Sequence, residues 1–250
     1  TRDVYLLEDK EFVILTKDGV ELRTEDGEKI EKEVYHVTWN VDAAEKGGYE
    51  HYMMKEIMEQ PDCVKKTLES YSKNGEITFG NIKLTEQKLK KINKIEIVAC
   101  GSAYHAGAVG KYVLEELLRI PVNVELASEF RYRNPIINEK TLTIAISQSG
   151  ETADTLAALK EAKARGSHTL AIVNVVGSSI ANAADDVLYT RAGPEIAVAT
   201  TKAYSAQLMA MYCLAVRFAL VRGKIDADAC AHYVEELQAI PDKMSRVLED

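Results

Sequence analysis

From Ile95 onward the chain alternates short apolar runs with longer segments of helical period. The runs are rich in β-branched residues and apolar on both faces, as strands are when helices cover both sides of a parallel sheet. The strand candidates are 95–100, 122–126, 141–146, 169–175 and 187–190, and the helix candidates are about 103–119, 152–165, 178–184 and 199–222. We therefore expect a three-layer α/β/α domain over about 75–222, with a doubly wound, flavodoxin-like, five-stranded parallel sheet.

A different pattern precedes this domain. Residues 1–45 contain β-type runs separated by Lys17-Asp18-Gly19 and Glu25-Asp26-Gly27. Asp-Gly turns between such runs are typical of β-hairpins. We therefore expect a short hairpin segment before the α/β domain, with the run 33–39 as its last strand.

Residues 46–74 have the composition of a linker between two units. The segment HYMMKEIMEQ predicts a short helix that ends at Pro61, and a second helix is expected from Asp62 to Tyr71. After Gly223, residues 223–250 resume as a helix that reaches the end of the sequence without a further strand.

The charge balance limits the classes of partner. The chain has 31 basic and 39 acidic residues, a net charge of −8, and no basic run that could follow a nucleic-acid backbone, so nucleic-acid binding is not expected. No stretch of about 18 residues is both apolar and uncharged, so no membrane span is expected, and the start, TRDVYLLEDK, does not resemble a secretory signal. We expect a cytoplasmic protein.

The cysteines and histidines show no metal-ligand spacing. The four cysteines are far apart, with no CxxC pair, and the five histidines are scattered along the chain. We therefore predict no disulfide framework, no metal site and no other cofactor.

The stretch TIAISQSGET, residues 143–152, joins a strand candidate to a helix candidate through hydroxyl and amide side chains. Ligands of open parallel sheets bind beyond the carboxyl ends of the strands, where helix N-termini present free N–H groups. The hydroxyls of Ser147, Ser149 and Thr152, the amide of Gln148 and the small Gly150 suit a phosphate group. The alternative is that one hydroxyl, from Ser149 or Thr152, only caps the following helix.

Two further strand ends carry similar residues. Gly101-Ser102-Ala103 follows the first strand, and Thr200 and Thr201 precede the long helix. Each could be a simple helix start, but the carboxyl ends of parallel strands meet at one edge of the sheet. His105 is left out of the catalytic set because a single histidine near a helix start is more often structural.

These motifs carry a family resemblance. In order along the chain, GSAYHAG, ELASEFRYR, SQSGETADTL, NVVGSSIANAAD and GPEIAVATTKAYSAQL resemble the isomerase half of the glutamine–fructose-6-phosphate aminotransferases, which are built from sugar isomerase (SIS) domains. The resemblance covers about residues 40–250. Residues 1–45 resemble the closing strands of that family's glutamine amidotransferase domain, and HYMMKEIMEQP resembles its interdomain linker.

The resemblance implies a function and a set of binding residues. Such enzymes make glucosamine 6-phosphate and glutamate from fructose 6-phosphate and glutamine, and form homodimers. It places the phosphate at Ser147, Gln148, Ser149 and Thr152, and the sugar also at Ser102, Ala103, Val198 and Thr200. The family usually has Gly-Thr-Ser where this chain has Gly101-Ser102-Ala103, which removes one hydroxyl from that position.

The family's catalytic residues have no counterpart in this sequence. Its glutaminase nucleophile is an N-terminal cysteine, whereas Thr1 stands first here. Its proton-transfer glutamate, Schiff-base lysine and ring-opening histidine belong to a second SIS domain that we expect beyond Asp250, so no catalytic residue is assigned within the chain.

Two alternatives remain open from the sequence. A single SIS domain can be a non-catalytic phosphosugar sensor, although a sensor would not need amidotransferase strands or the KEIMEQP linker. A stand-alone phosphosugar isomerase would need a carboxylate base within the chain, for which Glu129 and Glu195 lie near strand ends.

Overall fold

The computed structural model describes residues 3–36, 45–80 and 82–249. The chain divides into two compact units, Thr1–Glu45 and Lys46–Asp250. Residues 46–74, for which the sequence suggests a linker, lie within the second unit.

The first unit is a small antiparallel β-structure. Strands β2 (Glu11–Thr16), β3 (Gly19–Thr24) and β4 (Lys29–Ile30) form one sheet, and β1 (Asp3–Val4) pairs with β5 (Tyr35–His36). The register of β2 on β3 runs from Glu11 opposite Thr24 to Thr16 opposite Gly19, which leaves a two-residue turn, and Gly27 turns the chain from β3 to β4 at a φ of +85°. The predicted hairpins are confirmed; residues 37–39 of the predicted last strand lie outside the described residues.

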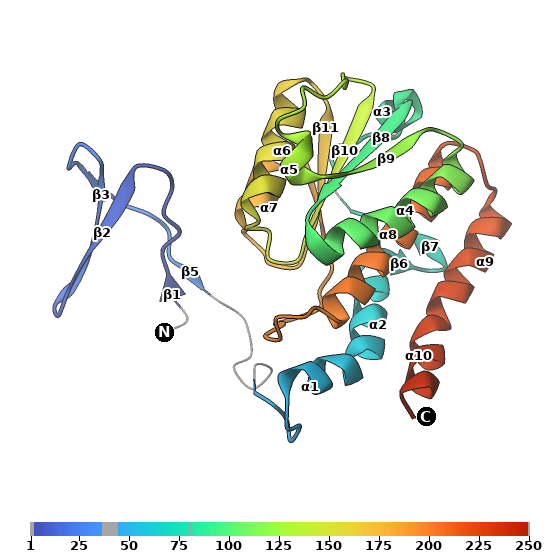
Figure 1. Cartoon of the computed structure of the whole chain (residues 1–250), viewed down its shortest axis with the longest axis horizontal. Coiled ribbons are helices and arrows are strands. Elements are labelled where there is room, and N and C mark those ends of the chain that lie inside the picture. The colour runs from blue at the N-terminus through green and yellow to red at the C-terminus, as the bar shows by residue number, and fades with distance from the viewer. Residues whose placement is uncertain (1–2, 37–44, 81, 250) are drawn as a thin grey trace. The chain divides into compact units, whose positions relative to one another are not determined.

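The second unit is built on a five-stranded parallel sheet. Its strands are β8 (Lys94–Ala99), β9 (Val122–Leu126), β10 (Thr141–Ser147), β11 (His168–Val173) and β12 (Asp186–Tyr189), in the spatial order β12-β11-β10-β8-β9. The strands from β11 to β9 are labelled in Figure 1. In chain order this is the 2-1-3-4-5 arrangement of flavodoxin-like folds. The fold predicted from the alternating runs is therefore confirmed.

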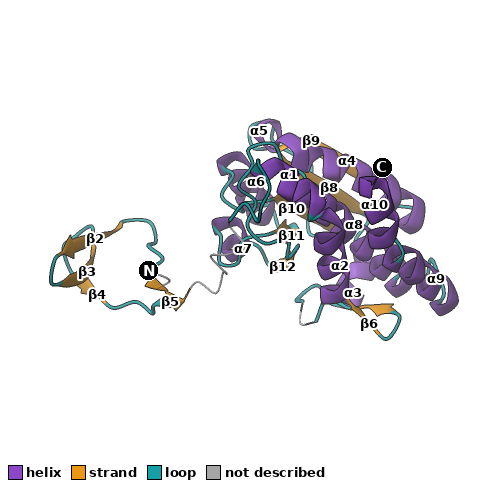
Figure 2. Cartoon of the chain, turned by 90° about the horizontal axis from the view of Figure 1, so that it is seen from below, coloured by secondary structure: helices purple, strands orange, loops and turns teal. Residues whose placement is uncertain are grey.

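Helices cover both faces of this sheet, as seen end-on in Figure 2. One face packs against α2 (Gln60–Tyr71), α3 (Glu86–Lys91), α4 (Gly101–Leu118) and α8 (Lys202–Val221), and the other against α5 (Ala127–Phe130), α6 (Ala153–Ala164) and α7 (Ser179–Ala183). Side chains alternate along each strand, so Ile97 joins the first layer and Val98 the second. Both faces are apolar because both are covered.

Helix α8 is the central helix of the first layer. Its sequence, rich in apolar residues on most faces, suggests burial against a second subdomain or a partner chain. In the structure α2, α4 and α9 (Ala227–Gln238) of this same unit cover most of α8, so its apolar faces are buried largely within the unit. By length and composition α8 is the one helix among the described residues that could cross a membrane, but two-thirds of that window (67%) is buried inside the structure, as in the core helix of a globular domain.

The flanking helices differ in detail from the prediction. Helix α1 (Tyr52–Met58) is followed directly by α2, which begins at Gln60 rather than Asp62 because Pro61 fits the first turn of a helix. A short hairpin, β6 (Ser72–Lys73) with β7 (Glu76–Ile77), then leads to α3. The single predicted C-terminal helix is two helices, α9 (Ala227–Gln238) and α10 (Ile240–Glu249), because Pro241 lacks the N–H that would continue the first.

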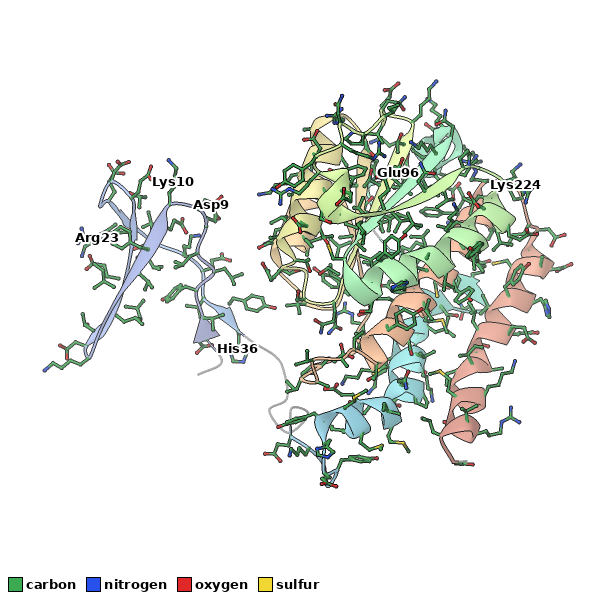
Figure 3. The ribbon with its side chains drawn as sticks, viewed as in Figure 1. Asp9, Lys10, Arg23, His36, Glu96 and Lys224 are labelled. Carbon is green, nitrogen blue, oxygen red and sulfur yellow. The ribbon has the colours of Figure 1, made fainter. Side chains whose placement is uncertain are left out.

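One carboxylate lies inside the sheet. Glu96 on β8, labelled in Figure 3, is fully buried; its Oε1 forms an ion pair with Lys94 Nζ at 2.5 Å and accepts a hydrogen bond from Asn123 Nδ2 at 3.1 Å. Both partners enter from the amino ends of β8 and β9. The charge is thereby paired at the edge opposite to the strand ends that carry the hydroxyl motifs.

Candidate functional site

The site lies at the point where the direction of winding reverses. From β8 the chain crosses to β9 on one side, and from β10 it proceeds to β11 on the other, so the helices that follow β8 and β10 leave a crevice between them. Ala99 at the end of β8 is in register with Ile146 near the end of β10. The motifs after these strands, 101–103 and 147–152, therefore share one edge of the sheet.

The loop 147–152 is organised by its own hydroxyl groups. The buried Ser147 Oγ accepts a hydrogen bond from Gly150 N at 3.0 Å and lies 3.0 Å from Thr152 Oγ1. Ser149 Oγ accepts from Glu151 N at 3.2 Å. These bonds fold the chain back on itself directly before α6.

Gly150 permits a close approach between this loop and the start of α7. Its φ is +69°, and a Cβ at this position would lie 2.0 Å from Ser178 Oγ. Its carbonyl oxygen accepts a hydrogen bond from Ile180 N at 2.9 Å. Ser178 Oγ is buried and has no hydrogen-bond partner among the described residues. Only a glycine fits here without displacing Ser178.

The acidic side chains beside the loop are engaged elsewhere. Glu151 Oε1 accepts a hydrogen bond from Ser179 N at 2.8 Å. Asp154, in the first turn of α6, pairs with Arg131 at 2.7 Å, and this hydrogen bond raises the pKa of the Arg131 guanidinium. The free N–H groups of the first turn of α6 thus face the loop without a competing unpaired carboxylate.

The structure separates the two roles considered for Thr152. Thr152 is the N-cap residue of α6, but its side chain accepts no capping hydrogen bond. Its hydroxyl lies instead against that of Ser147. The simple capping interpretation therefore does not account for Thr152.

The first strand end supplies a second group of predicted residues. Gly101, at a φ of +59°, begins α4, and Ser102 is exposed in its first turn, whereas Ala103 is buried against the core. Thr155 of α6 lies 3.8 Å from Cys100 Sγ, so α6 meets the end of β8. His105 is exposed and stacks edge-on against Tyr104, with ring centroids 5.4 Å apart.

Val198 and Thr200 lie on the loop that follows the edge strand β12. Val198 is fully exposed, and Thr200 Oγ1 donates to Glu195 Oε2 at 2.8 Å. Glu195 Oε1 also accepts from Thr201 N at 2.9 Å and from Ala203 N at 3.2 Å, which holds the carboxylate at the start of α8. Sequence reasoning offered Glu195 as a base, whereas the structure uses it to satisfy a helix N-terminus. Glu129, the other candidate, is exposed on α5.

Sequence reasoning missed the residue that connects the two loops. Asn174 follows β11, and its backbone N donates to Gln148 O at 3.1 Å. Its side-chain oxygen accepts from Ala192 N at 2.9 Å and Thr190 Oγ1 at 3.2 Å, and its Nδ2 donates to Gly193 O at 2.7 Å. An asparagine after a β-strand was the available signal. Asn174 therefore joins the 147–152 loop to the chain leaving β12.

The described residues contain no group of three or more His, Cys, Asp or Glu side chains placed to hold a metal ion. The side chains at this edge of the sheet provide neutral hydroxyl and amide donors beside a helix N-terminus. Such a set can hold an oxyanion.

The fold and this loop define a doubly wound α/β domain with a hydroxyl-rich loop at its switch point. The SIS domain family matches residues 88–217, just over half of the chain, and the chain belongs to that family. It is similar to the glutamine–fructose-6-phosphate aminotransferases (isomerizing) of Clostridium tetani, at 60% identity, and Clostridium perfringens, at 55%. Both alignments cover 100% of this chain and 41% of the relative, so the chain spans about two-fifths of the length of these curated relatives.

A solved structure agrees with these relatives. The C-terminal domain of glucosamine-fructose-6-phosphate aminotransferase from Francisella tularensis superposes with a TM-score of 0.75 at 40% identity. The superposition covers 79% of this chain and 55% of that one.

Proposed function

We propose that this chain is the part of a glutamine–fructose-6-phosphate aminotransferase that binds fructose 6-phosphate and glucosamine 6-phosphate. The observation that carries the proposal is the loop 147–152, whose hydroxyls gather at the switch point of the sheet and are not consumed by capping α6. The names of the relatives at 60% and 55% identity supply the substrate class.

The hydrogen-bond order in the loop suggests how a phosphate is held. Ser147 Oγ accepts from Gly150 N and can donate its own proton to Thr152 Oγ1. In that arrangement the O–H of Thr152 is free to donate to a phosphate oxygen. Ser149 and Gln148, both half-buried, and the first N–H groups of α6 complete the set of donors.

The strength expected of such a site suits a metabolite. Each hydrogen bond to a charged group contributes roughly 1.5–3 kcal/mol, and a helix N-terminus about 0.3–1 kcal/mol. After the costs of association, a few such contacts correspond to micromolar to millimolar affinity. The sugar would be contacted at Ser102, Ala103, Val198 and Thr200, as the family resemblance implies.

In the whole enzyme we assign residues 1–45 to the end of the amidotransferase domain and 46–74 to the linker. Residues 75–222 would form the SIS domain, and 223–250 would lead to a second one. Amino transfer needs catalytic residues that we do not assign to this chain. We therefore expect the chain by itself to show neither glutaminase nor synthase turnover in a coupled assay. The engagement of Glu195 with the start of α8 supports this over a stand-alone isomerase.

A homodimer in the cytoplasm is the natural setting for such an enzyme. An apolar hollow of about 560 Å³, lined in part by Tyr112, Leu117, Tyr212 and Tyr233, supports association through the α4, α8 and α9 surface. Tyr112 is 73% exposed there. Exposed aromatic side chains of this kind are common at interfaces.

Calorimetry tests the proposal directly. Glucosamine 6-phosphate and fructose 6-phosphate should bind, whereas glucosamine and fructose without the phosphate should not bind measurably. Ser149→Ala should weaken both sugar phosphates about tenfold or more. Equal affinity for the phosphorylated and unphosphorylated sugars would contradict a phosphate site.

A further inference from the structure

The linker helices, which include the motif KEIMEQP, form a series of contacts with the chain that leaves β12. Its helices α1 and α2 place a series of side chains along one face, because residues at i, i+3, i+4, i+7 and i+11 of a helical run lie on the same side. The members of this face are Glu56, Glu59, Gln60, Cys63 and Thr67. All of them bond to residues between 190 and 205, more than 120 positions further along the sequence.

Glu56 is the residue that holds the exposed part of the loop. Its side chain is 2% exposed, and Oε1 accepts hydrogen bonds from Ile196 N at 2.6 Å and Ala197 N at 3.2 Å. Oε2 lies 3.3 Å from Ala197 N as well. A buried carboxylate is costly without partners, and here its partners are backbone N–H groups next to Val198.

Glu59 and Gln60 hold the start of α8. Glu59 Oε2 accepts from the buried Lys202 Nζ at 2.6 Å, and Gln60 Oε1 accepts from Ser205 Oγ at 2.6 Å. Glu195 meets the same helix start from within the loop. Residues 195–205 are thus held both by side chains of the linker helices and by Glu195 within the segment itself.

Apolar packing does not fix this loop. Val198 is fully exposed and Ile196 is 50% exposed, so neither side chain anchors the segment in the core. Hydrogen bonds therefore restrain the conformation that presents Val198 and Thr200: those of Glu56 before Val198, and those of Glu195 at Thr200 and Thr201.

We infer that Glu56, Glu59 and Gln60 are positioning residues of the sugar-phosphate site, holding the 195–201 loop in the conformation that contacts the sugar. This rests on the proposed function. The phosphate loop 147–152 has its own internal hydrogen bonds, so the linker helices act on the sugar end of the ligand and not on the phosphate end.

The expected loss of affinity depends on how often the 195–201 loop has the conformation that contacts the sugar. The apparent affinity equals the intrinsic affinity multiplied by the fraction of molecules in which the loop is correctly placed. If loss of the Glu56 hydrogen bonds leaves the loop in place about one-tenth of the time, glucosamine 6-phosphate should bind about tenfold more weakly. Inorganic phosphate, held by 147–152 alone, should change by less than about twofold.

The experiment compares these two ligands on the full chain by NMR titration. Glu56→Ala should weaken glucosamine 6-phosphate about tenfold and leave phosphate nearly unchanged. Glu56→Gln keeps an Oε1 that can accept from both Ile196 and Ala197, and should restore most of the affinity. Glu69→Ala, an exposed glutamate on α2, is the matched control and should affect neither ligand.

Three results would overturn the inference: unchanged affinity of Glu56→Ala for glucosamine 6-phosphate, equal weakening of both ligands, or a Gln variant as weak as the Ala variant. Equal weakening would indicate a general structural role. If the parent binds phosphate normally but Ser149→Ala does not weaken it, the proposed site itself fails, which is distinguishable from failure of the positioning role.

Hydrogen exchange on the parent chain provides a test that does not depend on a variant folding. The amides of Ile196 and Ala197 should exchange more slowly with glucosamine 6-phosphate bound than with inorganic phosphate bound. Equal exchange with the two ligands would overturn the inference.

Discussion

Substitution of Thr152 by valine isolates one donor of the candidate phosphate site. Valine keeps the branched shape of threonine and removes the hydroxyl. In the structure this hydroxyl contacts Ser147 Oγ at 3.0 Å and does not cap α6. The change therefore removes one loop hydrogen bond and one donor to the ligand, and leaves the helix start otherwise intact.

The two consequences differ in size. Loss of a hydrogen bond to the ionised phosphate should weaken glucosamine 6-phosphate binding by roughly 1.5–3 kcal/mol, about tenfold or more. Loss of the neutral bond to Ser147 should reduce the free energy of unfolding by only about 0.5–1.5 kcal/mol. For a chain of this length that corresponds to a fall in melting temperature of about 1–6 °C.

Calorimetric affinity and thermal midpoint should be measured on the same samples, with Thr143→Val as the matched control. Thr143 lies on the same strand, β10, where its buried hydroxyl is 2.8 Å from Ser167 Oγ. The control should lose comparable stability and bind the ligand as the parent does. The phosphate-site reasoning is refuted if Thr152→Val melts lower yet binds as tightly as the parent.

Further expectations concern the loop, the pH dependence and the assembly. Gly150→Ala should destabilise the chain by about 2 kcal/mol or more, because of its positive φ and the contact with Ser178, and adding Ser178→Gly should recover part of the melting temperature. Partial burial raises the pKa of Asp185, but hydrogen bonds, above all from Lys163, outweigh it and hold the pKa at about 2. About 1–2 kcal/mol of stability should therefore be present above about pH 4 and be lost as the pH falls towards 2, and Asp185→Asn should abolish that dependence in acid denaturation. Light scattering at a protein concentration of tens of micromolar, at which weak interfaces form, should show a dimer. A monomer at that concentration would contradict association through the α4, α8 and α9 surface.

The sequence by itself determined the layered fold. Apolar runs of strand length separated by amphipathic segments can bury their surfaces only as a covered parallel sheet, and residues 143–152 placed a hydroxyl loop at a strand end. Local chemistry was enough because each of these features depends on neighbours within a few positions. The helix break at Pro241 was equally local, yet the pattern of 223–250 was interpreted as one helix.

Only the tertiary structure decided what each polar group does. The sequence left Glu195 as a candidate base, whereas its carboxylate accepts hydrogen bonds from the N–H groups of Thr201 and Ala203. The sequence assigned no role to Glu56, whose carboxylate accepts hydrogen bonds from the backbone at 196–197. Asn174 gained its role in the same way, through Gln148 on one loop and Ala192 and Gly193 on another. These roles follow from the proximity of segments up to about 140 positions apart, which the periodicity of a single sequence does not specify.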